Sequence, residues 1–443
     1  MGLSTFMGLQ TALRGILAQQ QALDITGHNI ANANTVGYTR QQAVLTPTPA
    51  YSNPGAMPGQ IGTGVDVTSY QRIRDEFIDT QLHAQTMRQG YYGALQDGLS
   101  QVETSLAEPS DNGISSLLQG FWSSWQDLSN NPESAGTRQA LVQSAASLAD
   151  GFRQLSSQLT TIQSQAGQNV TQTLSEINSA TASIAQLNDS IMKSKVVGDT
   201  PNDLMDQRDM LVDQLSQLVN VTRVDNPDGT IDLKVGSTSL VTGAASTPRV
   251  ETDFTAGDIT AGKLAGLIQV RDVVVPQQLS DLNGIASQLI TAVNAVHTSG
   301  VDLNGNPGVA FFTGTSAADI AVSAPVAADP SLVAASANGQ PGDPTNALKI
   351  AALQTSTTIN TDYQRFVTKV GSDSRDATRT YNNAKSLADS LESRRQSVSG
   401  VSLDEEMTNL VRFQRGFQAS ARALTAMDDM IDLLVSRTGK VGL

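Results

Sequence analysis

Apolar residues recur at alternating steps of three and four near both ends of the chain, and this spacing restricts what the ends can form. The rhythm falls on Phe6, Leu9, Leu13, Ile16, Leu23 and Ile30 at one end and on Leu403, Met407, Leu410, Phe417, Leu424 and Ile431 at the other. Such steps place side chains on one narrow stripe of an α-helix. A lone helix with so thin a stripe is marginal in water. The spacing therefore predicts two terminal helices that pair with each other and with neighbouring subunits.

The start of the last helix carries a capping signal. Ser402 precedes Leu403, and Glu405 follows three residues after Ser402. In a capping box the hydroxyl accepts from the amide of the third helical residue, whose carboxylate returns to the cap. Asp404 and Glu406 add negative charge near the positive end of the helix dipole. We therefore expect the helix to begin at residue 403.

The interior alternates between long helical patterns and short extended ones. Helical spacing covers residues 92–106, 138–197, 204–218, 264–296 and 347–391. Alternation with period two marks residues 38–45, 62–73 and 221–254, the last with a turn at Asn226-Pro227-Asp228-Gly229. Residues 300–345 are rich in Gly, Pro, Ala, Ser and Asn and have little periodicity. This pattern predicts a mainly α protein with a smaller β and loop-rich insertion that faces outward.

Three regions follow from these patterns. The terminal coiled-coil region is expected at 1–33 and 401–443, the helical bundle at 34–219, 261–300 and 346–400, and the β and loop-rich outer region at 220–260 and 301–345. The length of 443 residues is enough for two or three domains.

Composition excludes several classes of function. The formal charge of −14 repels nucleic acid and anionic bilayers, so neither is an expected partner. The chain has no Cys, which removes disulfides and thiolate chemistry. Polar residues interrupt every apolar run before membrane-spanning length. Residues 1–6 have no basic segment before an apolar run, so no Sec signal peptide is expected.

Candidate sites for chemistry are weak. Asp302-Leu303-Asn304-Gly305-Asn306 begins like a calcium loop, but Pro307 stands where Gly is required and Thr313 where Glu is required. The histidines His28, His83 and His297 are far apart and lack metal-ligand spacing. We predict no metal, no cofactor and no catalytic residues.

The aromatic residues Phe121, Trp122 and Trp125 could stack a ligand. Their helical spacing makes core packing the better interpretation.

A segment after the first helix resembles a known signature. Residues 28–41 read His-Asn-Ile-Ala-Asn-Ala-Asn-Thr-Val-Gly-Tyr-Thr-Arg-Gln, which is similar to the motif of flagellar rod, hook and hook-associated axial proteins. The residues that carry the motif are Asn29, Asn32, Asn34, Gly37, Tyr38 and Arg40. Asn and Gly tolerate the left-handed backbone angles that a helix exit needs.

Two further stretches narrow the resemblance. Residues 202–209 read Asn-Asp-Leu-Met-Asp-Gln-Arg-Asp, and residues 399–406 read Ser-Gly-Val-Ser-Leu-Asp-Glu-Glu, followed by Asn409-Leu410 and by Arg412-Phe413-Gln414. With residues 38–41 they resemble the hook-associated protein 1 family of hook-filament junction proteins.

The resemblance implies a non-enzymatic subunit that is exported by the flagellar type III apparatus and joins hook to filament by polymerising through its terminal helices. The implied partners are copies of itself, the hook protein, the second junction protein with the filament, and an export chaperone that binds the C-terminal region.

Two alternatives stay open at this point. One is a hook or rod axial subunit. The other is a secreted coiled-coil effector or hydrolase, which would need a convergent polar pocket. The terminal stripes also have an interpretation without assembly, because any helical protein can contain such a seam between helices of one chain.

Overall fold

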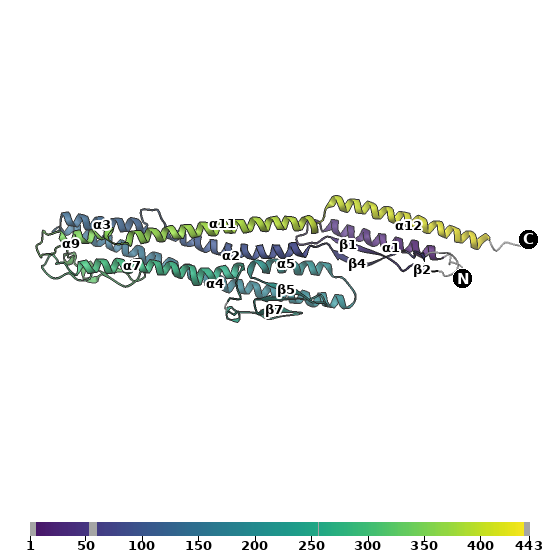
Figure 1. Cartoon of the computed structure of the whole chain (residues 1–443), viewed down its shortest axis with the longest axis horizontal. Helices are drawn as coiled ribbons and strands as arrows, with labels where there is room; N and C mark the ends of the chain where they lie inside the picture. Colours follow the sequence, from purple (N-terminus) through teal and green to yellow (C-terminus); the bar gives the residue numbers. More distant parts are fainter. Residues whose placement is uncertain (1–5, 53–59, 256, 438–443) are drawn as a thin grey trace, which may run out of the picture.

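The computed structural model describes residues 6–52, 60–255 and 257–437. It is an elongated molecule in which the first and last helices of the chain lie at one tip (Figure 1). The N-terminal helix α1 (Phe6–Ala31) and the C-terminal helix α12 (Leu403–Arg437) lie side by side there. The rest of the chain forms a long helical body, so the fold is mainly α as predicted.

A β-hairpin lies beside α1. Strand β1 (Gln41–Pro47) pairs antiparallel with β4 (Val65–Arg72), and Gln41 lies opposite Arg72. The short strands β2 (Tyr51–Ser52) and β3 (Gln60–Ile61) extend the hairpin. This pairing joins the first two of the three stretches in which the sequence alternates with period two, residues 38–45 and 62–73.

Long helices build the body. Helix α2 (Glu76–Leu106) runs antiparallel to α11 (Ile359–Ser399), with Asp79 near Arg395 at one end and Glu103 bonded to Ser374 further along. Helix α4 (Ala135–Val196) has 62 residues, about 93 Å at 1.5 Å per residue.

Three helical segments complete the packing of the body against α2 and α4. The segments are α5 (Asn202–Leu218), α6 (Gly262–Gln269) and α7 (Val275–His297), with a π turn at Val270–Val274 between the last two.

A small sheet packs against α4. Its strands are β5 (Thr222–Asp225), β6 (Ile231–Val235), β7 (Thr238–Thr242) and β8 (Ala245–Ser246), followed by a short 3-10 turn at Glu251–Asp253. The strands pair in chain order, and Ile231, Leu233 and Val235 are buried. The turn at residues 226–229 stands between β5 and β6, as its sequence predicts.

Short elements close the far tip of the body. They are α3 (Ile114–Asn130), β9 (Phe312–Thr313), β10 (Ala321–Val322), α8 (Ala324–Ala328), a 3-10 turn (Pro330–Leu332), α9 (Thr345–Ala351) and α10 (Leu353–Ser356). Phe121, Trp122 and Trp125 are buried there, which confirms the prediction that they belong to the core.

Residues 301–345 pack into this tip through several apolar side chains. Phe311, Phe312, Ile320 and Val326 are buried in the same apolar cluster as the aromatic residues of α3. The segment therefore lies at the far tip, whereas residues 220–260 lie along the middle of the body (Figure 1). The sequence did not predict this core contribution, because the apolar residues stand at irregular spacing between turns.

Among the described helices, none has the length and hydropathy that crossing a membrane requires.

Candidate assembly interface and the polar joint behind it

The terminal helices approach each other closely along a row of small residues. Gly8 faces Met427, and Gly15 faces Ser420, so α1 and α12 run antiparallel. A Cβ atom added at Gly8 would lie 2.6 Å from the Met427 sulfur, and one at Gly15 would lie 2.9 Å from the Ser420 oxygen. A side chain at either position would require the Met427 or Ser420 side chain to move. The two glycines therefore let those side chains lie directly against α1.

The buried face of α1 continues this row. Its buried residues are Ala12, Ala18, Ala22, Thr26 and Asn29. The row follows steps of four and three, as the predicted stripe does, through Gly8, Ala12, Gly15, Gln19, Ala22, Thr26 and Asn29. Five of these residues, Gly8, Ala12, Gly15, Ala22 and Asn29, stand one position before a residue of the predicted stripe. A search for small residues at heptad spacing would have found the row; a search for large apolar residues does not.

None of the twelve predicted stripe residues is fully buried. Eight of them are partly buried, namely Leu9, Ile16, Leu23, Ile30, Leu410, Phe417, Leu424 and Ile431. Phe6 is 57% exposed, Leu13 45%, Leu403 51% and Met407 53%. The stripe lies beside the α1–α12 seam and stays in part open to solvent.

Further large apolar side chains extend this exposed surface. Leu17 is 50% exposed on α1, and Val411 is 48% and Met430 57% exposed on α12. We call Leu13, Leu17, Met407, Val411 and Met430 the open apolar face. These residues belong to both terminal helices, and exposed apolar side chains of this size mark sites of interaction.

Asn29 connects the end of α1 to both neighbouring segments. Its Nδ2 donates to the Gln41 carbonyl at 2.8 Å and to the Glu406 carboxylate at 3.1 Å. Its Oδ1 accepts from the Gln41 amide at 3.0 Å and from the Tyr38 hydroxyl at 2.7 Å. Asn29 is 1% exposed, so one buried amide side chain joins α1, the hairpin and α12.

Arg40 binds the start of α12. Its Nε donates to Glu406 at 2.7 Å, and its NH1 group donates to Glu405 at 2.5 Å. The Glu405 amide donates to the Ser402 hydroxyl at 3.5 Å, which forms half of the predicted capping box. The other half is wrong, because the Glu405 carboxylate binds Arg40. A charged partner from the signature segment holds it more strongly than a backbone amide would.

We call the polar cluster around Asn29, Tyr38, Arg40, Gln41 and Glu406 the polar joint. Helix α5 forms its opposite wall. The Asp206 carboxylate accepts from the Thr39 amide at 2.9 Å, and Asp203 accepts from the Gln41 side chain at 2.8 Å. Asn202 donates to Gln41 Oε1 at 3.0 Å. Burial raises the pKa of Asp206, although its bonds to Arg72 and Thr39 oppose that effect. The three sequence stretches that carry the family resemblance thus meet at one place.

The Asp209 carboxylate binds three arginine side chains. One comes from β4, one from the segment after β4, and one from β5. Arg72 donates to it at 2.7 Å, Arg223 donates at 2.7 Å, and Arg74 also pairs with it. Burial alone would raise the pKa of Asp209, but the three guanidinium groups lower it to about 2. Such a carboxylate stays ionised at all physiological pH values. It ties the hairpin and the sheet to α5.

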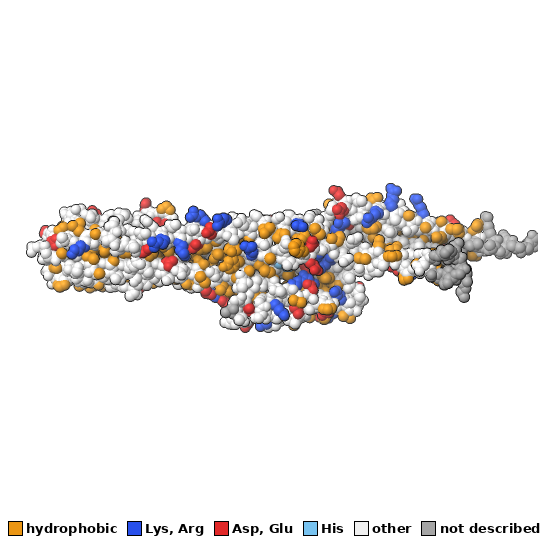
Figure 2. Space-filling model, viewed as in Figure 1, with side chains coloured by type: hydrophobic (Ala, Val, Ile, Leu, Met, Phe, Trp, Pro, Cys, Tyr) orange, Lys and Arg blue, Asp and Glu red, His pale blue; other side chains and the backbone are white. Residues whose placement is uncertain are grey.

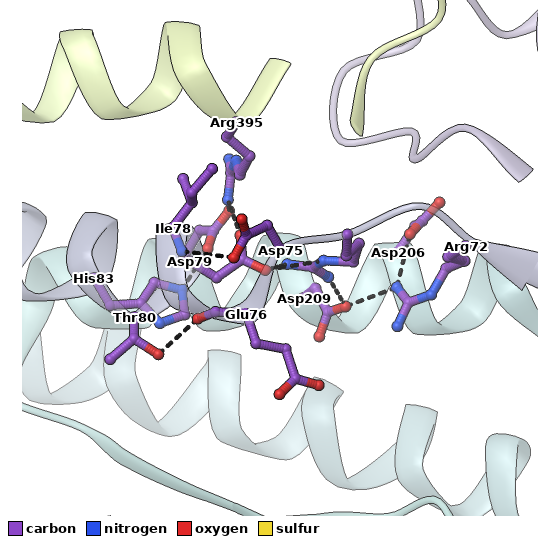
Figure 3. Close-up of polar contacts among 12 residues, drawn as sticks. Arg72, Asp75, Glu76, Ile78, Asp79, Thr80, His83, Asp206, Asp209 and Arg395 are labelled. Carbon is purple, nitrogen blue, oxygen red and sulfur yellow. Dashed lines mark hydrogen bonds and ion pairs between the residues drawn. The ribbon is translucent and has the colours of Figure 1, made fainter. Parts of the chain in front are cut away.

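Further ion pairs hold α11 to α2 and α5 on the other side of the joint (Figure 3). Arg395 donates to Asp213 at 2.7 Å and lies 3.7 Å from Asp79. The His83 ring bonds Asp213 at 2.7 Å. Burial would raise the pKa of Asp213, but His83 and Arg395 lower it.

The remaining motif residues shape the turn after α1. Asn32 donates to the His28 carbonyl at 3.1 Å, and Asn34 is exposed. Gly37 has a φ of 81°, the left-handed angle that the sequence predicts for this helix exit. Burial raises the pKa of the Tyr38 hydroxyl, and the carboxylates of Asp203, Asp206 and Glu406 raise it further.

Within the described ranges, no group of three or more His, Asp or Glu side chains is placed to hold a metal ion. The Asp302 carboxylate accepts from the amides of Asn304 and Asn306, both at 2.8 Å, so a turn explains the calcium-like sequence. His297 is buried among Trp125 and Phe311 and bonds the backbone through both ring nitrogens.

Comparisons with known proteins agree on one family. A family model for the "Flagellar hook-associated protein FlgK helical domain" matches residues 99–312. Models for the "Flagella basal body rod protein" and the "Flagellar basal body rod FlgEFG protein C-terminal" match residues 9–39 and 392–437. The two rod models cover the terminal helices, and the helical-domain model covers much of the body.

Two relatives and one solved structure extend the match. Flagellar hook-associated protein 1 of Bacillus subtilis is 34% identical over 99% of this chain and 99% of its own length. The protein of the same name from Salmonella typhimurium is 34% identical over 68% of this chain and 58% of its own length. The flagellar hook junction protein FlgK of Burkholderia pseudomallei shares the fold over 72% of this chain and all of its own, with a TM-score of 0.65 at 16% identity. The chain therefore belongs to the flagellar hook-associated protein 1 family and is a structural component of the bacterial flagellum.

Proposed function

We propose that this chain forms the junction between hook and filament by polymerising through α1 and α12. The observation that carries the proposal is the open apolar face. Met407 and Val411 are about half exposed on α12, as Leu13 and Leu17 are on α1. The small-residue seam already uses the other side of α1. Two helices that pair along one side and each carry exposed apolar side chains elsewhere are suited to pack against further helices of the same kind.

The polar joint supports this proposal. Its ion pairs and buried amides connect the terminal helices to the body through side chains on α1, the hairpin, α5 and α12. Hydrogen-bonded networks of this kind fix geometry, because each partner loses a buried bond if the helices tilt. We infer that the joint sets the direction in which the body projects from the polymerised terminal helices.

The three regions then have separate roles. The terminal region at 1–33 and 401–443 assembles, and the bundle at 34–219, 261–300 and 346–400 spaces the subunits. The segments 220–260 and 301–345 present the outer surface. Copies of this chain, the hook protein, and the second junction protein with the filament are the proposed partners. No enzymatic role is proposed.

Export from the cell precedes assembly in this proposal. Unassembled α12 would expose Met407, Val411 and Met430 to other apolar surfaces, so it needs a cover before export. A chaperone that binds the C-terminal region would supply that cover. We propose secretion through the flagellar type III apparatus with this chaperone bound beforehand.

Complementation of a strain that lacks the junction protein tests the proposal. Such a strain should keep its hooks and shed unpolymerised flagellin into the medium. The wild-type chain should restore filaments. A chain with Leu13→Gln and Leu17→Gln should not restore filaments. Each leucine is about half exposed, so burying the rest of it on assembly contributes about 1 kcal/mol, which the substitution removes.

The matched control changes a polar residue of the same helix. Gln21→Ala alters the exposed residue Gln21 and should leave filaments intact. Both variants should unfold at the wild-type temperature, because neither touches the body. Filament growth by the doubly substituted chain at wild-type level would refute the proposed assembly surface.

A further inference from the structure

Charged side chains on α12 are sorted by sign along the helix. The first group, which we call the basic block, consists of Arg412, Arg415 and Arg422. The second group, which we call the acidic block, consists of Asp428, Asp429 and Asp432. The side chains of both blocks are exposed. In the space-filling view, basic side chains are visible on the side of α12 that faces away from α1 (Figure 2).

Neither block has an ion-pair partner among the described residues. The ion pairs of α12 are confined to its first turn, where Arg40 binds. The Arg412 guanidinium lies over the ring of its neighbour Phe413, 4.8 Å from the ring centre. Opposite charges on one helix pair at spacings of three or four residues, and Arg422 stands six residues before Asp428. The blocks of one copy are therefore too far apart in sequence to pair along the helix.

Helix α11 arranges its charges differently. It has 41 residues, against 35 in α12. Five ion pairs join residues three or four apart along it, namely Arg365–Asp362, Lys369–Asp373, Arg379–Asp376, Lys385–Asp389 and Arg395–Glu392. Such pairs settle the charges of a helix surface within one chain. Solvation gives no reason to separate the two signs along α12, so their sorting points to a partner outside the chain.

The charged residues form a stripe on the far side of α12 from α1. Ser420 faces α1 at Gly15. Arg415, Arg422 and Asp429 stand seven residues apart, which places them in one row along the helix. With 3.6 residues per turn, this row lies about 160° around the helix from Ser420. We call the row the outer stripe of α12. It is free to meet another molecule while α1 and α12 stay paired.

A second copy of α12 offers the charges that the outer stripe lacks. In two parallel copies at the same height, each block would face its own kind. A shift of about 14 residues, or about 21 Å, is two heptads and keeps the same face in contact. It places residues 412–422 of one copy beside residues 426–436 of the other, so the basic block meets the acidic block. It also sets Val411 beside Thr425 and Leu433 beside Ala419, so each larger apolar side chain meets a smaller residue.

We propose that the outer stripe of α12 docks onto the outer stripe of a second copy of this chain, parallel to it and shifted by about 21 Å. Complementary charges across an interface fix its register and act against wrong alignments. The open apolar face supplies contact area, and the two blocks select the shift. The inference rests on the proposed function, because it specifies the register of copies that polymerise through α12.

Reversal of the blocks in the full-length chain tests the pairing. Arg415→Asp with Arg422→Asp makes both blocks mainly acidic. In a strain that lacks the junction protein, the fraction of cells with filaments should then be at least about tenfold lower than with the wild-type chain, because like charges face each other. Asp429→Arg with Asp432→Arg should have the same effect. The chain with all four changes carries the blocks in exchanged order and should restore filaments.

A charge reversal elsewhere provides the matched control. Arg88→Asp changes an exposed arginine of α2 and should leave filaments intact. The purified block variants should unfold at the wild-type midpoint, because the blocks form no ion pairs within the described chain. Wild-type filament levels with either doubly substituted chain would overturn the inference. Failure of the fourfold change to restore filaments would also overturn it, because the blocks would then pair with a different protein.

Cross-linking in assembled flagella measures the shift itself. The chain has no Cys, so Arg415→Cys and Asp429→Cys chains each carry one thiol. When the two chains assemble together and are oxidised, they should form disulfides with each other, because the shift brings these positions side by side. Arg415→Cys chains alone should form none. Their thiols would be about 21 Å apart, and a disulfide needs Cα atoms within about 7 Å of each other.

These results separate the inference from the proposed function. Assembled junctions without disulfides between the Arg415→Cys and Asp429→Cys chains would refute the shifted contact and leave polymerisation through α1 and α12 intact. Disulfides among Arg415→Cys chains alone would also refute the shift, because they require copies at the same height. Filament growth by the chain with Leu13→Gln and Leu17→Gln would instead refute the proposed assembly surface.

Discussion

Replacing Asp209 by asparagine removes the carboxylate that three arginines share. The side chain keeps its size, so packing in α5 is preserved. Arg72, Arg74 and Arg223 then lose their common counter-charge. Because all three guanidinium groups are largely buried, water replaces the lost contacts only in part.

The magnitude follows from the pKa of the carboxyl. Asp209 titrates at about 2 in the folded chain, against an ordinary value of 3.8. Each unit of pKa corresponds to about 1.4 kcal/mol, so the charge contributes about 2 kcal/mol to folding. Because the folded pKa is lowered, this stability is fully present above pH 4 and is lost as the pH falls toward 2. Asp209→Asn should therefore lose about 2 to 4 kcal/mol at pH 7.

Urea denaturation at several pH values measures both effects. The wild type should lose stability between pH 4 and pH 2, and the Asp209→Asn chain should lack the part of this loss that comes from residue 209. Asp225→Asn is the matched control, because Asp225 also binds Arg223 but its side chain is 65% exposed, and such pairs contribute less than about 1 kcal/mol. Equal effects of the two substitutions at pH 7 would refute the assigned role of Asp209.

Three further predictions test other parts of the structure. Gly15→Leu should separate α1 from α12, since even a Cβ would lie 2.9 Å from Ser420, and faster hydrogen exchange in α1 would report it. The Arg40→Ala and Glu406→Ala double-mutant cycle should give a coupling of about 1 to 3 kcal/mol in denaturation, and a coupling near zero would contradict the contact. Burial lowers the pKa of His297 to about 4, so about 3 kcal/mol of stability should be lost as the pH falls from 6.5 to 4. His297→Gln should lack that step when followed by the fluorescence of the neighbouring Trp125.

Elements with strong periodicity are the ones that sequence patterns predict well. The long helix predicted for 138–197 is α4 at Ala135–Val196, and the segment predicted for 264–296 runs as α6, a π turn and α7. A large apolar residue on every turn of a helix leaves little freedom in which face is buried. The interruption at Val270–Val274 was not predicted, because it depends on how Pro276 is accommodated by Gln163 of a distant helix.

The polar joint shows where such prediction stops. The sequence identifies residues 29–41, 202–209 and 399–406 as notable stretches. Only the folded chain shows that Asn29 bonds Gln41 and Glu406, and that Asp203 and Asp206 bond Gln41 and Thr39. Their partners are 12 to 377 residues apart, and no local spacing encodes those pairs. The small-residue seam of α1 was missed for a different reason, because the large apolar residues beside it dominate the helical pattern.

Solvent access to the open apolar face tests the central claim most directly. The chain has no Cys, so single variants such as Leu13→Cys and Met407→Cys each carry one thiol. Both should react rapidly with a maleimide in the free subunit and at least about tenfold more slowly in assembled hook-filament junctions. A cysteine in place of Val309, which lies at the far tip and is 39% exposed, calibrates the reagent in both states. Reaction rates at positions 13 and 407 that are the same in the free and assembled chain would contradict polymerisation through the terminal helices.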